Sequence, residues 1–225
     1  MLRSGRLLAL DENAAQLTAA GLIRLGVEEQ LDKTAGTPAW LGRMRAASFA
    51  DAWLAFGDPP GPGLRVPAGP VLQSVVHQAA ELLLQTRGGD GAAVLDCLGR
   101  QSAQAREQAH RTGAAHPAEP TALTMVWHGV HVVTADRRHT PPDTRVHGRH
   151  IDERYEAYVR ERHRRQDTLA LVLSCARIAA TALVELSDGD PARAAGRLEE
   201  HAACYMPRGG PAPMWVPGRF GPPSD

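Results

Sequence analysis

The chain has 225 residues, 43% of them hydrophobic, so it is long enough to bury a core of ordinary size and has the composition of a globular protein. Its 25 basic and 25 acidic residues cancel, which argues against wholesale electrostatic capture by nucleic acid or by a membrane surface. The three cysteines, Cys97, Cys175 and Cys204, are odd in number and far apart, which is typical of free thiols in a reducing compartment rather than of a disulfide framework.

The sequence favours a cytoplasmic protein without a membrane span. The apolar run at residues 7–10 is cut off by Asp11 and Glu12 and is too short for the core of a signal peptide. Residues 168–186 approach the length of a membrane span, but Arg177 near their centre would cost about 3 kcal/mol in a bilayer. We therefore expect a cytoplasmic location and no membrane insertion.

Helical patterns dominate the first third of the chain. Residues 11–33 are rich in Ala and Leu, although Gly21 and Gly26 predict one kinked helix or two short ones. A second helix is predicted to start at Thr37, where a proline follows in the first turn. Residues 58–70 are rich in Pro and Gly and predict an extended connector.

Two further helices are predicted between this connector and residue 111. Residues 70–87 place Leu and Val on one face and are followed by a double-glycine stop. Asp90 is a cap for the next helix, which extends to about Arg111 and is polar after Leu98. We expect the far end of that helix to project into solvent.

Residues 123–134 are the place where β-branched and aromatic residues concentrate. A short strand or β-hairpin around Gly129 competes there with a buried helical turn. Because two lone strands are marginally stable without packing, this stretch should lie against the long helix that follows it.

One long helix is predicted for residues 150–186, which contain neither Gly nor Pro. From residue 168 on it is so apolar that its polar side chains form one narrow stripe at spacings of three and four. The stripe consists of Ser174, Arg177, Thr181, Glu185 and Asp188. A helix with so little polar surface is covered on most sides, so we expect a mainly α-helical bundle packed around it, with Leu171, Ile178 and Ala182 buried.

The end of the chain is predicted to contain one more helix and a tail. A tight turn at residues 187–190, with Asp190 followed by Pro191, predicts a final helix that folds back on the long one. We interpret residues 1–206 as a single helical domain. Residues 207–225 are rich in Pro and Gly and predict a flexible tail.

A repeated tetrapeptide provides the sharpest candidate site. His128 and His131 flank a Gly-Val pair, and His147 and His150 flank a Gly-Arg pair. Imidazoles three residues apart on a helix can share one metal ion, whereas on a strand they point to opposite faces. Four histidines would suit zinc or another divalent ion, so the pattern predicts a metal site. The alternative is a set of solvated loop histidines.

Residues 137–165 form a basic stretch, with nine Arg and four His against five carboxylates. Arg160, Arg162, Arg164 and Arg165 could contact the phosphates of RNA or DNA. The alternative is a solvated helix face, because Glu and Arg four residues apart stabilise such a face.

Two pairs of carboxylates, Glu153 with Glu156 and Glu185 with Asp188, resemble the ExxE and ExxD pair of the MazG-like all-helical nucleotide pyrophosphohydrolases. The resemblance implies Mg²⁺ held between two helices for attack on a nucleoside triphosphate. In one unbroken helix Glu156 and Glu185 would lie about 43 Å apart and could not share an ion. A break near residues 166–168 would be needed to bring the two pairs together.

The sequence contains no Ser-His-Asp pattern, no Gly-rich phosphate loop and no CxxC pair, and it identifies no cofactor. We therefore expect a non-catalytic, cytoplasmic helical binding or regulatory protein whose partner is another protein or a second copy of the chain. The alternatives are a metal-dependent nucleotide hydrolase and a nucleic-acid-binding protein.

Overall fold

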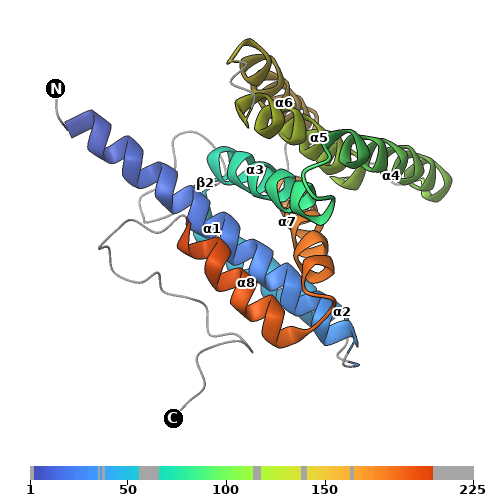
Figure 1. The fold of residues 1–225 in the computed structure, drawn as a ribbon. Helices are drawn as coiled ribbons and strands as arrows, with labels where there is room; N and C mark the ends of the chain where they lie inside the picture. The colour runs from blue at the N-terminus through green and yellow to red at the C-terminus, as the bar shows by residue number, and fades with distance from the viewer. Residues whose placement is uncertain are drawn as a thin grey trace.

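Eight helices account for nearly all of the chain that the computed structural model describes, which is residues 3–34, 36, 39–55, 66–113, 118–137, 141–162 and 165–204. They are α1 (Arg3–Thr34), α2 (Ala39–Trp53), α3 (Ala68–Thr86), α4 (Gly91–Thr112), α5 (Ala118–Arg137), α6 (Pro141–Arg162), α7 (Arg165–Leu186) and α8 (Pro191–Ala203) (Figure 1). Two short strands, β1 (Leu54–Ala55) and β2 (Val66–Pro67), pair in parallel. The predicted mainly α-helical bundle is confirmed.

The helices form three layers. α3 and α7 lie in the middle, with α1, α2 and α8 on one side and α4, α5 and α6 on the other (Figure 1). α7 packs mainly against α3, α1 and α5, and its side chains Leu171, Val172, Ala179 and Leu183 are fully buried. The apolar sequence of residues 168–186 therefore predicts the central helix of the bundle.

Two glycines allow the layers to approach closely. A Cβ at Gly26 in α1 would lie 2.8 Å from Cβ of Ala180 in α7, and one at Gly129 in α5 would lie 2.7 Å from Cγ1 of Val76 in α3. Any larger residue would push these helices apart. α1 continues through Gly26 as one helix, because its packing against α7 outweighs the low helix propensity of glycine, about 1 kcal/mol.

Both predicted aspartate caps are confirmed. The side chain of Asp90 accepts a hydrogen bond from the backbone N–H of Ala93 at the start of α4. Asp190 accepts from the N–H groups of Ala192 and Arg193 at the start of α8. Each cap satisfies backbone donors that the first turn of a helix leaves unpaired.

α8 contacts both α1 and α7, and a buried glutamine ties it to the middle layer. Gln78 of α3 is 1% exposed; its amide nitrogen donates to the carbonyl of Gln16 in α1, and its oxygen lies 2.9 Å from Nε2 of His201 in α8. The predicted flexible tail, residues 207–225, lies outside the described residues.

Residues 123–134 are helical and form the middle of α5. The β-hairpin considered for this stretch is therefore wrong, and the helical alternative is confirmed. Met125, Val126 and Val130 are fully buried, since α5 packs against α3, α4, α6 and α7. A short apolar run that is covered on several sides cannot be assigned to strand or helix from periodicity, so tertiary packing decides.

The helix predicted for residues 150–186 is divided in the structure. α6 ends at Arg162 and α7 begins at Arg165, while residues 163–164 lie outside the described ranges. α7 enters the middle layer, whereas α6 packs along α5 in an outer layer (Figure 1).

One local signal marks the start of α7. Asp167 lies in its first turn, where a carboxylate stabilises the start of a helix. The absence of Gly and Pro in residues 150–186 did not reveal this start.

The segment Gln166–Leu186 is long and apolar enough to cross a membrane by length and composition. The core helix of a soluble protein meets the same criterion, so this is weak evidence for insertion. In the fold, this segment is the central helix α7.

Candidate functional site

Four histidines that are separated in the sequence lie together between α5 and α6. Nδ1 of His128 lies 3.1 Å from Nδ1 of His147, and the rings of His131 and His147 stack with their centroids 4.2 Å apart. The ring centroid of His150 lies 5.1 Å from that of His128. The structure thus brings together all four residues of the predicted metal site, and we call them the histidine layer.

The local sequence of α5 explains why two of these histidines face α6. Gly129 packs against Val76 of α3, and Val130 is fully buried. His128 and His131, three residues apart, are left on the side of α5 that α6 covers. The glycine of the second tetrapeptide differs, since a Cβ at Gly148 would meet nothing within 4 Å.

Arg154 fixes the proton positions in the layer. Its Nε lies 3.4 Å from Nε2 of His128 and can act only as a donor, so Nε2 of a neutral His128 is the acceptor and its proton is on Nδ1. The Nδ1–H group of His128 then donates to Nδ1 of His147. A chain of two hydrogen bonds therefore runs from Arg154 through His128 to His147.

Trp127 closes one side of the layer. Its ring packs edge-on against His131, with 4.1 Å between the centroids, and also contacts His128. Nε2 of His131 is buried and has no hydrogen-bond partner among the described residues. A protonated His131 would leave a charged N–H group there without a partner.

The environment of the layer favours neutral imidazoles. Burial lowers the pKa of His128 from 6.5 to about 4, and the Arg154 guanidinium and the other three histidines add to the shift. Burial also lowers the pKa of His131 and of His147, with neighbouring histidines adding to the effect and Asp143 opposing it. These three side chains are therefore uncharged at pH 7.

A metal ion would require a different arrangement of the layer. Zinc needs ligand atoms about 2.0–2.1 Å from one point. The stacked rings of His131 and His147 are nearly parallel, at 7°. A metal ion on Nδ1 of His128 would require a proton on Nε2, but Nε2 accepts a hydrogen bond from Arg154. Among the described residues, no group of three or more His, Cys, Asp or Glu side chains is arranged to hold an ion. The metal site remains a prediction of the sequence.

Three of the four arginines predicted to contact nucleic acid lie at or near the facing ends of α6 and α7. Arg160 is exposed and lies 3.9 Å from the carboxylate of Glu156, as expected for a solvated helix face. Arg162 ends α6 and Arg165 begins α7, while Arg164 lies outside the described residues. Phosphate binding by this group remains a prediction.

The four carboxylates of the MazG-like pattern pair with four different partners. Those pairs are Glu153 with His150, Glu156 with Arg160, Glu185 with Arg87 and Asp188 with Arg193. They lie on α6, on α7 and in the turn that follows it, and α6 and α7 make few contacts with each other. The pairs support separate surface ion pairs more than one shared Mg²⁺ site.

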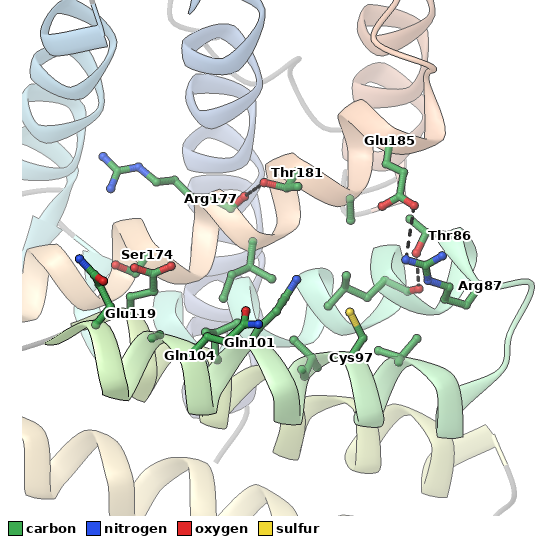
Figure 2. A pocket seen from close by; sticks show the side chains of 18 residues that line it. Thr86, Arg87, Cys97, Gln101, Gln104, Glu119, Ser174, Arg177, Thr181 and Glu185 are labelled. Carbon is green, nitrogen blue, oxygen red and sulfur yellow. Dashed lines mark hydrogen bonds and ion pairs between the residues drawn. The ribbon is translucent and has the colours of Figure 1, made fainter. Parts of the chain in front are cut away.

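A second candidate site is a cleft of about 570 Å³ between α4 and α7, floored by α3 and α5. Figure 2 shows Thr86, Arg87 and Glu185 at one end and Glu119, Gln104 and Ser174 at the other. The apolar side chains that line it include Leu83, Val94, Leu98, Leu123 and Ile178. We call this site the α4–α7 cleft.

Four members of the predicted polar stripe on α7 line this cleft: Ser174, Arg177, Thr181 and Glu185. The stripe therefore marks the face of the central helix that other helices leave open. Ile178 lies on the same face and is only partly buried, so the prediction that it belongs to the core is wrong. Leu171 and Ala182 are buried as predicted.

Side chains of neighbouring helices hold the stripe in place. Nε of Arg177 lies 3.4 Å from a carboxylate oxygen of Glu29 in α1, which is only 3% exposed. Gln30 donates to the hydroxyl of Thr181, and Glu185 lies 3.6 Å from Arg87 at the end of α3. These contacts pre-position polar groups along one wall of the cleft.

The sequence did not predict that α4 forms the opposite wall of the cleft. α4 lines the cleft with Val94, Cys97, Gln101, Gln104 and Gln108. Their spacing alternates between three and four, which places them on one face of a helix. That spacing was the available signal, but polar residues at helical spacing ordinarily indicate plain solvent exposure.

Comparison of the chain with protein families, with curated proteins and with solved structures finds no match. The similarity to the MazG-like enzymes therefore rests on the four carboxylates alone.

Proposed function

We propose that this chain is a non-catalytic binding protein that receives an amphipathic helix of a protein partner in the α4–α7 cleft. The observation that supports the proposal is the position of the cleft along the polar stripe of the central helix. A face of the central helix that remains open is a natural place for one more helix to pack.

The dimensions of the cleft suit a helix. Its lining residues extend from Val94 to Gln108 on α4 and from Ser174 to Glu185 on α7. At 1.5 Å per residue these walls are about 21 Å and about 16 Å long, which corresponds to about three or four turns. α4 and α7 both pack on α5 but make few contacts with each other, so no helix of the described residues lies between them.

The chemistry of the cleft defines the partner. The apolar floor favours a narrow stripe of Leu, Ile or Ala at helical spacing, and the side-chain amides of Gln101 and Gln104 can bond to polar residues beside that stripe. Arg87 and Glu185 at one end already pair with each other, so a strongly charged partner has no counterpart there. We therefore expect an amphipathic helix of low net charge.

The experiment is a selection of helical peptides from a display library on the purified full chain, with the Ile178→Asp variant as counter-target. This substitution would place a carboxylate on the apolar floor, and enriched peptides should carry apolar residues at positions i, i+3 or i+4, and i+7. Their binding should be lost in Ile178→Asp. Val146→Asp, which changes a 52% exposed valine on α6, is the matched control and should bind normally.

Alkylation by iodoacetamide locates the peptide. Cys97 lines the cleft, Cys204 is exposed on α8, and burial raises the pKa of Cys175 so that its thiol stays unreactive. A peptide at ten times its Kd should slow alkylation of Cys97 about tenfold and leave Cys204 unchanged.

Three results would contradict the proposal. The first is a library without enriched peptides, and the second is peptide binding that survives Ile178→Asp. The third is protection of Cys97 that grows with the concentration of the chain alone, which would assign the cleft to a second copy.

A further inference from the structure

The helix α6 is attached to the rest of the bundle in an unusual way. It packs along α5 and makes few contacts with α3 and α7. Among its described side chains, residues 142–161, the buried ones are Ile151 and Tyr158. Tyr155, which is partly buried, also packs against the core, with its ring beside Gly69 of α3. Three apolar anchors are few for a helix of 22 residues, so polar contacts contribute to its attachment.

The histidine layer supplies such polar contacts. His147, His150 and Arg154 lie on one face of α6 and meet His128 and His131 of α5. The chain of hydrogen bonds requires uncharged rings, because a protonated imidazole has no acceptor nitrogen. Protonation of both stacked rings would place like charges 4.2 Å apart. Charging the layer would also set like charges beside Arg154.

We propose that the histidine layer makes the attachment of α6 to α5 sensitive to protons, so that α6 separates from α5 under mildly acidic conditions while the core of α1, α3 and α7 stays folded. The inference is independent of the function proposed for the α4–α7 cleft, since no member of the layer lines that cleft.

The charges around the layer favour this response. Among the described residues, the groups that act on its histidines are Arg154, Asp143 and the histidines themselves. Two carboxylates oppose the response: Asp143 partly offsets the lowered pKa of His131 and of His147, and Glu153 pairs with His150 at 3.2 Å. Ionisable groups of α3, α4 and α7 pair elsewhere: His77 with Glu81, Arg87 with Glu185, Asp96 with Arg100, Glu107 with Arg111, and Arg177 with Glu29.

A polar contact outside the layer also opposes separation. Gln73 of α3 donates a hydrogen bond to Asp152 of α6. It is an exposed hydrogen bond and cannot hold α6 alone.

The size of the effect follows from His128. Its pKa is about 4 with α6 attached and 6.5 when the ring is free in water. Protons therefore favour the separated state by about 25-fold at pH 5 relative to pH 7.5, from this residue alone. His131 and His147 act in the same direction.

The test is hydrogen–deuterium exchange of the full chain at pH 7.5 and pH 5, expressed as protection factors so that the intrinsic pH dependence of exchange cancels. Protection of α6 should fall at least about 20-fold, as expected for local opening of a helix. Protection of α7 should change by less than about threefold.

Variants separate the layer from other acid effects. His128→Phe keeps a ring at the centre of the layer but cannot take up a proton, so it should reduce the pH response of α6 by about tenfold or more. Arg154→Gln, at an exposed position, should reduce the pH response of α6 by a smaller factor. It replaces His128→Phe in the test if that variant does not fold. His110→Asn, at an exposed site of α4 outside the layer, should leave the response unchanged.

Three outcomes would overturn the proposal. If α6 and α7 lose protection together, acid unfolds the whole bundle. If α6 keeps its protection at pH 5, the layer does not control its attachment. If equimolar Zn²⁺ at pH 7.5 raises the protection of α6 more than about tenfold, as tight metal binding would, the layer is a metal site.

Discussion

The attachments of α6 and of α7 differ in kind, although the two helices are neighbours in the sequence. α7 packs through small and apolar side chains such as Ala179, Ala180 and Leu183, all of them fully buried. α6 packs through Ile151 and Tyr158 but also through imidazole rings whose hydrogen-bond chain requires them to be neutral. Apolar contacts do not titrate, so the comparison teaches that pH should act on α6 and leave the attachment of α7 intact.

The largest expected effect is a charge placed in the α7 interface. Leu183→Asp removes a fully buried side chain and inserts a carboxylate without a partner, so the free energy of unfolding should fall by at least about 4 kcal/mol. Urea unfolding followed by circular dichroism measures the change.

Ile178→Asp is the matched control for that experiment. It lies on the same helix but lines the cleft, so its cost should be at most about 2 kcal/mol. Equal losses for the two variants would mean that Ile178 belongs to the core and that the cleft is closed.

The second effect is the dependence of stability on pH. The pKa of His128 is lower in the folded chain, about 4, than in the unfolded chain, 6.5. Its stabilising contribution is therefore complete above pH 6.5 and is lost as the pH falls toward 4. The free energy of unfolding should drop by about 2 kcal/mol between pH 7.5 and pH 5 from His128 alone, and His128→Phe should remove that part. A wild-type chain that is equally stable at both pH values would contradict the description of the layer.

The smallest effect separates the two glycines of the repeated tetrapeptide. Gly129→Ala should destabilise the chain by about 1–3 kcal/mol, because the added Cβ would overlap Val76. Gly148→Ala has open space and should stabilise α6 by about 0.5–1 kcal/mol. Thermal melts of the two variants should therefore shift in opposite directions. Shifts of the same sign would show that α5 does not approach α3 as closely as the structure has it.

Local signals predicted much of the fold. Asp90 and Asp190 mark helix starts because a side-chain oxygen must satisfy unpaired N–H groups within the next three residues. The apolar sequence of residues 168–186 identified the central helix for a similar reason, since its narrow polar stripe leaves few faces for solvent. These rules depend on neighbours along the chain.

Signals that depend on distant parts of the chain were harder to interpret. The repeated His-x-x-His motif indicated four histidines that act together, but the sequence did not show that Arg154 would fix their protons. Ile178 looked like a core residue because its exposure depends on how far α4 stands from α7. The boundary between α6 and α7 depends on which helices each packs against, and an apolar pattern does not contain that information.

The most direct test of the α6 attachment is nuclear magnetic resonance of the histidine rings between pH 7.5 and pH 4.5. Nitrogen shifts distinguish the Nδ1–H tautomer from the Nε2–H tautomer, and their pH dependence gives the pKa of each ring. His128 should be the Nδ1–H tautomer with a pKa of about 4. An Nε2–H tautomer with a pKa at or above 6.5, the value of a free ring, would contradict the account.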